Sequence, residues 1–497
     1  MLISAAAMQQ HEQAVIAGGI SAAKLMDAAA AGIAKCLRQF FPQPGLLVCY
    51  CGTGNNVGDA LAVAAILQHE GWQIAVRLAS DPAAFKELPA AHWEAIREAC
   101  VVCSSADEVQ ALRQDGPLVL LDGLIGLGSR GPLREGLKRL AVEINHLREV
   151  AHAQVIAIDL PSGVDPDTGT PHEGAVIADI TTTIAHAKQG LVADAATAHV
   201  GRLVVIPVAE LELHAAADAE VITPRLLLPL LPRRRFDWHK GTAGRVSLIA
   251  GSPRFAGAAV LCALGAMRGG AGLVTLFCKA ELHATLSARL PPEVMLRTVA
   301  SFVEALDHPA DAIAIGPGLG GEVDHEICEM VETAKCPVVV DADALNAISR
   351  TGADLLLKTK GLRLLTPHPG EMTRLDGHVD MDRRQRAEAF AAMYPNVTLL
   401  LKGSRTVIAT SGMPTRFNTT GHPGMAAGGM GDVLSGLLAA LLCQKLTPHD
   451  AASLGSWLLG RAAELALHSP HTSPESLSAT DVAAHLGTAF NALRDGF

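Results

Sequence analysis

Short apolar segments that run into loops rich in glycine, aspartate or asparagine recur along this 497-residue chain, and they constrain its fold more than any other feature. In the first half, residues 46–51, 73–78, 118–122 and 155–160 predict buried strands, and residues 59–69 predict a helix. Strands that alternate with helices are typical of parallel α/β sheets. We therefore expect an α/β fold whose ligands bind at the loops that follow the strands.

The alternation is interrupted once and then restarts. Residues 213–238 contain several prolines and three consecutive arginines, at 233–235, and we place a domain boundary there. This boundary predicts a first domain over residues 1–213 and a second over residues 224–497. In the second domain the predicted strands are 245–250, 273–277, 312–315, 338–341, 363–366 and 397–402, and the predicted helices are 258–267 and 432–442.

Composition excludes several classes of protein. With 49% hydrophobic and 18% charged residues, the chain is not intrinsically disordered. A net charge of −10 and an aromatic content of 3% argue against a general nucleic-acid binder, which needs a basic face and stacking side chains. The sequence shows no apolar run long enough to cross a bilayer and no secretory signal pattern. We expect a cytoplasmic protein with no nucleic-acid or membrane partner.

Three loops of the first half carry polar groups at strand ends. They are Gly-Thr-Gly-Asn-Asn-Val-Gly-Asp at 52–59, Asp-Gly-Leu-Ile-Gly-Leu-Gly at 122–128, and Asp-Leu-Pro-Ser-Gly-Val-Asp at 159–165. The first loop opens a helix, where free N–H groups favour an anion such as phosphate. Each loop alone could be a tight turn or a helix cap. Because parallel strands bring their ends to one sheet edge, three such loops favour a binding site.

Oxygen-bearing side chains in these loops indicate a cation. Asn56, Asp122 and Ser162 offer an amide oxygen, a carboxylate and a hydroxyl, a set that suits a hard cation and does not suit zinc or copper. Asp159 is then left as a candidate acid or base.

The segment 418–436 is the richest of the second half, and an apolar helix follows it. Gly428, Gly429 and Gly431 precede this helix, so their N–H groups can form an anion-binding nest. Asp432 falls in the first helical turn, where a carboxylate beside bound phosphate can accept a proton from an attacking hydroxyl. Its alternative role is a helix cap. A cap does not require the preceding glycines, so we favour catalysis.

Four further strand-end loops of the second half carry polar groups: 316–320, 341–346, 366–371 with His368 between two prolines, and 402–406 with donors for a nucleotide. No Walker A pattern occurs in the sequence, so a nucleotide site here is not of the P-loop class.

The motifs at 52–59, 159–165 and 428–436, the last reading Gly-Gly-Met-Gly-Asp-Val-Leu-Ser-Gly, together resemble the bifunctional NAD(P)H-hydrate repair enzymes. The first half resembles the epimerase domain of that family, which implies a Rossmann-like three-layer α/β fold. The second half resembles the ADP- or ATP-dependent dehydratase domain, which implies a ribokinase-like α/β fold. The helical start around Leu25, Met26 and Asp27 is also similar to the family's N-terminal segment.

The resemblance implies a metabolite-repair activity. NADH and NADPH can add water across a ring double bond, giving hydrates (NADHX and NADPHX) that cannot donate hydride. An epimerase would interconvert the R and S hydrates, and a dehydratase would convert the S form back to the cofactor. The nucleotide would phosphorylate the hydroxyl, because phosphate leaves far more readily than hydroxide does.

Site residues are carried over from the family motif by motif. In the epimerase site, the hydrate would be held by Asn55, Asn56, Val57, Gly58, Asp59, Gly126, Leu127, Gly128, Ser129, Arg130, Gly131, Pro132 and Asp159, with Asp159 catalytic. Potassium would be bound by Asn56, Asp122 and Ser162. In the dehydratase site, the hydrate would contact Ala258, Gly318, His368 and the catalytic base Asp432, and the nucleotide would contact Lys402, Gly403, Ser404, Arg405, Thr406 and Gly431.

The resemblance also implies Mg²⁺ with ADP or ATP, NADHX or NADPHX as substrate, and a homo-oligomer. Val57 and Ala60 replace two glycines of the usual family loop, and a valine is disfavoured where φ is positive. An alternative function is a ribokinase-like small-molecule kinase that keeps its phosphorylated product, with a first half that binds a ligand without catalysis.

Overall fold

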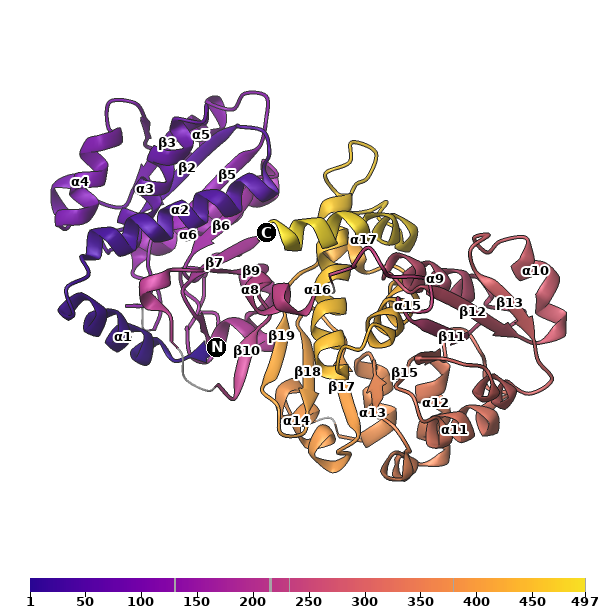
Figure 1. Ribbon diagram of the computed structural model, residues 1–497. Helices are drawn as coiled ribbons and strands as arrows, with labels where there is room; N and C mark the ends of the chain where they lie inside the picture. The colour runs from indigo at the N-terminus through magenta and orange to yellow at the C-terminus, as the bar shows by residue number, and fades with distance from the viewer. Residues whose placement is uncertain (129–130, 214–216, 232, 379, 497) are drawn as a thin grey trace. The chain divides into compact units, whose positions relative to one another are not determined.

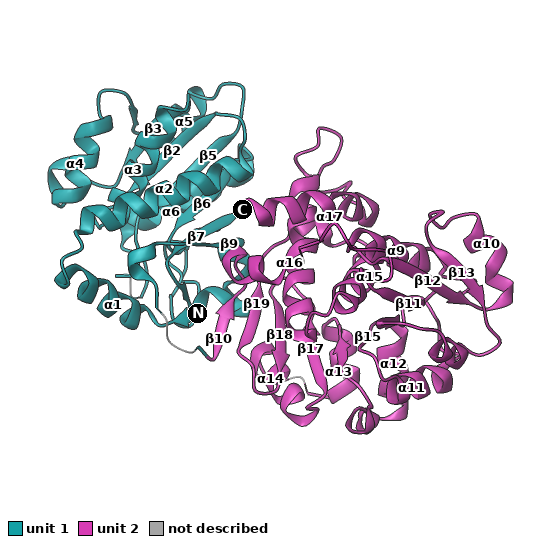
Figure 2. Cartoon of the chain, viewed as in Figure 1, with its two compact units in different colours: residues 1–217 teal, residues 218–497 magenta. Residues whose placement is uncertain are grey.

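The protein is described by a computed structural model that covers residues 1–128, 131–213, 217–231, 233–378 and 380–496 (Figure 1). The chain divides into two compact units, Met1–Ala217 and Asp218–Phe497 (Figure 2). The division falls inside the proline- and arginine-containing stretch 213–238, of which 214–216 and 232 lie outside the described residues.

A seven-stranded parallel sheet forms the centre of unit 1. Its order is β4 (Val101–Cys103), β3 (Gln73–Leu78), β2 (Leu46–Cys51), β5 (Leu118–Gly123), β6 (Gln154–Ile158), β7 (Ile180–Ile184) and β9 (Arg202–Ile206). A small parallel pair, β1 (Leu2–Ile3) and β8 (Ala187–Lys188), lies outside this sheet. The central strands are buried on both faces, which explains their continuous apolar sequences.

Helices cover both faces of this sheet. One apolar core joins it to α2 (Ala22–Phe40), α3 (Asn56–Gln68) and α4 (Glu87–Ile96), and a second joins it to α5 (Ala106–Ala111) and α6 (Glu135–Val150). α1 (Ala5–Ala17) packs in a smaller cluster with the N-terminal part of α2. Unit 1 is therefore the three-layer α/β arrangement that the sequence predicts.

Unit 2 is built on a ten-stranded mixed sheet. Its order is β10 (Ala219–Val221), β19 (Thr415–Asn418), β18 (Thr406–Thr410), β17 (Val397–Leu401), β16 (Arg363–Leu365), β15 (Val338–Val340), β14 (Ala312–Ile315), β11 (Arg245–Ile249), β12 (Leu273–Cys278) and β13 (Met295–Thr298). Only β18 runs antiparallel to its neighbours among the described strands.

Four helices share one apolar core with this sheet: α9 (Ala256–Arg268), α15 (Met430–Cys443), α16 (Pro448–Ala466) and α17 (Ala479–Arg494). The other face carries α11 (Asp324–Thr333), α12 (Asp343–Thr351), α13 (Pro369–Asp376) and α14 (Arg383–Met393) (Figure 1). Glycine lets α9 and α15 approach closely: a Cβ on Gly265 would overlap the Val433 carbonyl, and one on Gly436 would overlap the Cys262 carbonyl.

All ten predicted strands are confirmed to within two residues at either end. The sequence analysis missed β1, β4, β7, β8, β9, β10, β13 and the β18–β19 hairpin, and most of these strands have at most four residues or carry threonines. α3 begins at Asn56, three residues before the predicted helix, so Val57 lies in its first turn. Val57 is not among the residues with positive φ, and its side chain is buried in the core.

No helix among the described residues combines the length and the apolarity that spanning a bilayer requires.

Candidate functional site

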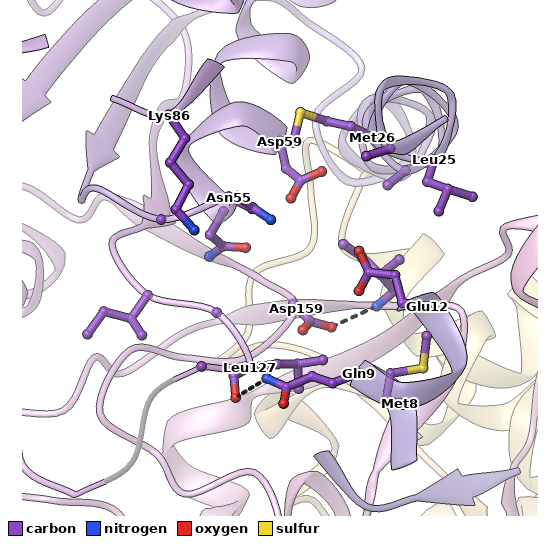
Figure 3. Close-up of a pocket in the computed structure, with 18 of the residues that line it drawn as sticks. Met8, Gln9, Glu12, Leu25, Met26, Asn55, Asp59, Lys86, Leu127 and Asp159 are labelled. Carbon is purple, nitrogen blue, oxygen red and sulfur yellow. Dashed lines mark hydrogen bonds between the residues drawn. The ribbon is translucent and has the colours of Figure 1, made fainter. Parts of the chain in front are cut away.

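The three predicted loops of unit 1 meet at one edge of its sheet, because β2, β5 and β6 are direct neighbours. They line a cavity of about 760 Å³ (Figure 3). Of the predicted hydrate-binding residues, the following line this cavity: Asn55, Asn56, Asp59, Gly126, Leu127, Gly128, Pro132 and Asp159.

The other predicted residues of this site lie elsewhere. Val57 and Gly58 are buried in α3 and do not line the cavity, and neither does Gly131. A Cβ on Gly58 would come 2.5 Å from Met26 Sδ, so this glycine allows α2 to pack against α3. Ser129 and Arg130 lie outside the described residues.

Asp159 is held in an unusual conformation at the floor of the cavity. Its backbone has a φ of 66°, which is rare for a residue other than glycine. Its carboxylate pairs with the buried ammonium of Lys188 and accepts a 3.1 Å hydrogen bond from Ile184 N–H. Strained residues with several partners cluster at functional sites, so the structure supports a role for Asp159.

Two more carboxyl groups face this cavity, from Asp59 in α3 and Glu12 in α1 (Figure 3). Burial raises the pKa of Asp59 well above its usual value, and the charges of Asp159 and Glu12 raise it further. Burial also raises the pKa of Glu12, with the charge of Asp159 adding to it and Lys188 opposing it. The cavity thus combines a carboxyl group whose pKa is raised by burial with a carboxylate that is ion-paired to Lys188.

The predicted cation ligands lie next to the cavity and are buried. Asp122 is 0% exposed, and it accepts hydrogen bonds only from neutral groups of the described residues: Ser162 N–H at 2.8 Å, Ser162 Oγ at 2.7 Å and Leu124 N–H at 3.2 Å. Burial raises its pKa to about 6. The Asn56 side chain donates through Nδ2 to the Ile158 carbonyl, which leaves its oxygen available. A buried carboxylate without a cationic partner fits a site for a bound cation.

Sequence analysis missed the residues that α1, α2 and β8 contribute to this cavity. They are Met8, Gln9, Glu12, Gln13, Ile16, Ala22, Leu25, Met26, Ala29 and Lys188. Gln9 reaches the second predicted loop, since its Nε2 donates to the Leu127 carbonyl at 3.2 Å. Met8 and Glu12 are four residues apart on α1, so they share one face of this helix. A single polar residue on a helix is usually solvated, so Glu12 did not indicate a site in the sequence.

The second site lies where β11, β14, β15, β16 and β17 end side by side, opposite the start of α15. Gly429 occupies the N-cap of α15 in the left-handed conformation, and no side chain caps this helix. Its first N–H groups are therefore free to bind an anion. Asp432 is the third residue of α15 and accepts no hydrogen bond from the described residues, so it is not the helix cap.

Lys402 lies beside the start of α15. Its Nζ is 2.7 Å from Asp341 Oδ1 and 3.9 Å from Glu371 Oε2. A Cβ on Gly431 would lie 3.4 Å from Lys402 Nζ, so a side chain at this position would occupy part of the space between the ammonium and the helix start. Burial tends to lower the pKa of Lys402, but the carboxylates of Asp341 and Glu371 outweigh it and the pKa is raised. The ammonium therefore stays charged beside the free amides.

The other oxygen of Asp341 accepts a 2.8 Å hydrogen bond from Ser435 Oγ. Ser435 lies one turn after Asp432 on α15, so Asp341 links β15, Lys402 and this helix. Ala342, which follows it, has a φ of 49° and a ψ of −116°, a conformation that residues with a Cβ rarely adopt.

The charges around Asp432 and its burial change its pKa. Burial raises its pKa to about 6, with the negative charges of Asp341 and Asp343 adding to the rise and Lys402 opposing it. Asp432 is thus a carboxylate at neutral pH, and it is more basic than an ordinary aspartate.

The remaining predicted residues surround this centre. His368 caps α13, with Nδ1 accepting from Gly370 N–H at 3.0 Å, and its other ring nitrogen is 3.5 Å from Glu371. A Cβ on Gly318 would lie 2.8 Å from that of Ala258, so these two residues are in contact. In the loop after β17, Gly403 and Ser404 are exposed, Thr406 is half-buried and Arg405 is buried.

Comparisons with known proteins match both units. A family model described as YjeF-related protein N-terminus matches residues 22–190, and one described as NAD(P)H-hydrate dehydratase matches residues 246–485. The bifunctional NAD(P)H-hydrate repair enzyme Nnr of Coxiella burnetii is 33% identical over 97% of this chain and 98% of its own length. The chain belongs to the family of bifunctional NAD(P)H-hydrate repair enzymes.

Other members of the repair-enzyme family show the same correspondence. The Escherichia coli enzyme is 33% identical over 90% of this chain and 86% of its own length. A crystal structure of the ADP/ATP-dependent NAD(P)H-hydrate dehydratase from Bacillus subtilis, co-crystallised with ATP and Mg²⁺, matches with a TM-score of 0.50 and 32% identity. The match covers 56% of this chain and all of that one. The predicted ribokinase-like fold of the second unit is confirmed.

Proposed function

We propose that unit 1 interconverts the R and S hydrates of NADH and NADPH, and that unit 2 dehydrates the S form with ADP or ATP as the phosphoryl donor. Membership of the repair-enzyme family over nearly the whole chain supports both activities. The observation that carries the dehydratase assignment is Asp432, a carboxylate without a hydrogen-bond partner among the described residues, beside free helix amides and Lys402.

In the proposed dehydration, the amides at the start of α15 and the ammonium of Lys402 bind the nucleotide phosphates. Asp432 accepts the hydroxyl proton of the hydrate as the hydroxyl oxygen attacks the terminal phosphorus. Phosphate then leaves with the electron pair of the C–O bond, and the ring double bond is restored.

Magnesium bound with the nucleotide would neutralise charge on the phosphates. Asp343 would hold it, because this carboxylate lies at the same sheet edge and forms no salt bridge among the described residues. One of its oxygens accepts a 2.8 Å hydrogen bond from Gly320 N–H, which fixes its orientation.

An assay with a mixture of R and S hydrates tests the function. With ADP or ATP present, we expect the absorbance of the dihydronicotinamide to recover until both epimers are consumed. Asp159→Asn should stop the consumption of the R hydrate and leave that of the S hydrate intact, because only unit 1 loses its charged group. A stable phosphoester instead of recovered absorbance would support the kinase alternative. The cytoplasmic location and the homo-oligomer stay predictions.

Potassium is the cation that we propose for Asn56, Asp122 and Ser162, where it would compensate the buried charge of Asp122. We expect potassium chloride to raise the melting temperature of unit 1 relative to tetramethylammonium chloride at equal ionic strength. A ligand at about 100 times its Kd adds roughly 2.7 kcal/mol of stability. Asp122→Asn should remove the difference between the two salts.

The pH dependence of this effect follows from the carboxylate. Because burial raises the pKa of Asp122 to about 6, protonation below that pH should weaken potassium binding. Equal melting temperatures in both salts at neutral pH would contradict the cation site.

A further inference from the structure

Asp59 is a buried carboxyl group that no described residue hydrogen-bonds. It lies in the first turn of α3, is 8% exposed and lines the cavity of unit 1. Buried polar side chains nearly always have a partner in the protein or in ordered water. Its oxygens face the cavity, so a bound molecule is the partner that the fold leaves for them (Figure 3).

The surroundings of Asp59 favour its protonated form. Burial is the main cause of its raised pKa, and the charges of Asp159 and Glu12 act in the same direction. The other charged side chains that line the cavity are Lys86, Arg134 and Lys188. The ammonium of Lys188 pairs with Asp159 and also donates to Thr183 Oγ1 at 3.1 Å and to the Ile184 carbonyl at 3.2 Å, so its donors are already used. The raised pKa favours the protonated form of Asp59, which is the form that can donate a proton into the cavity.

Asp159 has the opposite environment in the same cavity. It is paired with Lys188 and accepts hydrogen bonds from Ile184 N–H at 3.1 Å and Thr183 Oγ1 at 3.4 Å. All of these donors stabilise a carboxylate. Two carboxyl groups of one site in different environments, one desolvated without a hydrogen-bond partner and one ion-paired, are the arrangement that assigns an acid and a base.

We propose that Asp59 is the proton donor and Asp159 the proton acceptor of the epimerisation. This inference rests on the proposed function of unit 1. Water adds to an enamine so that the hydroxyl is attached to the carbon next to nitrogen. Departure of the hydroxyl from one face and addition of water to the other face inverts that carbon.

The proton of Asp59 passes to the hydroxyl oxygen, and the C–O bond breaks with its electron pair on the departing water. The lone pair of the ring nitrogen forms a C=N bond. A second water then attacks the other face of the carbon, the C=N electron pair returns to nitrogen, and the water's proton passes to Asp159. Proton exchange with solvent returns Asp159 and Asp59 to their starting states.

Glu12 acts on this pair without touching the reacting carbon. In Figure 3 its carboxyl group points toward Asp59 from α1. Its negative charge disfavours ionisation of Asp59, so Glu12 is a positioning residue that keeps the donor protonated.

Asp59→Asn tests the donor, because the amide has the same shape and is neutral like the protonated acid. Without nucleotide, and after subtraction of the rate without enzyme, we expect epimer exchange to fall by roughly 10²–10⁴-fold. Dehydration of the S hydrate should be unchanged in this variant. Asp27→Asn is the matched control, since Asp27 lies on α2 with a side chain 67% exposed and outside the cavity lining.

Glu12→Gln tests whether the charge of Glu12 keeps Asp59 protonated, and the pH profile of epimer exchange is the measurement. The exchange rate of the wild type should fall at high pH as Asp59 loses its proton, and removal of the Glu12 charge should move this fall to lower pH. Exchange that persists in Asp59→Asn would overturn the proposal while the proposed function stands. A wild type that exchanges no epimers would instead overturn the epimerase function itself.

Discussion

Replacement of Asp432 by alanine should abolish dehydration of the S hydrate while the adenine nucleotide still binds. The carboxylate that accepts the hydroxyl proton is lost, which costs roughly 10²–10⁴-fold in kcat. The proposed phosphate contacts should remain, because the backbone amides of α15 and the ammonium of Lys402 are unchanged. Alanine is also a better helix former than aspartate, so α15 should keep its structure. Recovery of dihydronicotinamide absorbance and nucleotide titration measure the two effects.

Asp495→Ala is the matched control for this variant, since it removes an exposed aspartate at the end of α17. Epimer exchange by unit 1 should continue in both variants. The wild type should lose dehydratase activity below a pH of about 6, because the raised pKa of Asp432 places its protonation there. Near-normal turnover of Asp432→Ala would refute the assignment of the base.

Lys402→Met should lose stability as well as activity. Asp341, 2% exposed, would keep its negative charge but lose the ammonium 2.7 Å away. Removing one partner of a buried pair typically costs about 3–5 kcal/mol, because the other charge stays buried without compensation. Denaturant unfolding of the full chain, monitored by a signal that comes from unit 2, measures this loss of the free energy of unfolding.

The double variant Lys402→Met with Asp341→Asn separates the two consequences. With both charges removed, we expect most of the stability to return. Nucleotide affinity should stay low, because the ammonium beside Gly431 is still absent. If the double variant bound nucleotide as the wild type does, Lys402 would be a structural residue only.

The sequence predicts the strands that position both sites because these strands are buried on both faces and read as unbroken apolar runs. The positions of Asp159 and Asp432 follow from this, since each comes directly after a strand or opens a helix. The position of Asp122 follows in the same way. The positions of these residues depend on the strand or helix next to them in the chain, so a short sequence motif is enough to predict them.

Other features depend on contacts between distant segments. Lys188 meets Asp159 because Asp159 follows β6 and Lys188 follows the neighbouring strand β7, and Glu12 reaches the cavity because α1 packs against α2. Val57 replaces a family glycine without positive φ because α3 begins earlier than its motif suggests. No periodicity within these segments indicates such contacts, so tertiary packing alone determines them.

The close approach of α9 and α15 has a consequence for motion. Backbones that touch through Gly265 and Gly436 cannot slide past each other without steric overlap, so the two helices behave as one rigid block. Ala258 lies on α9 and Asp432 lies on α15, so we expect the distance between them to stay constant during catalysis. A closing motion around a nucleotide would then involve the loops 316–320 and 403–406 on the other side of the sheet edge, and not a shift of α9 against α15.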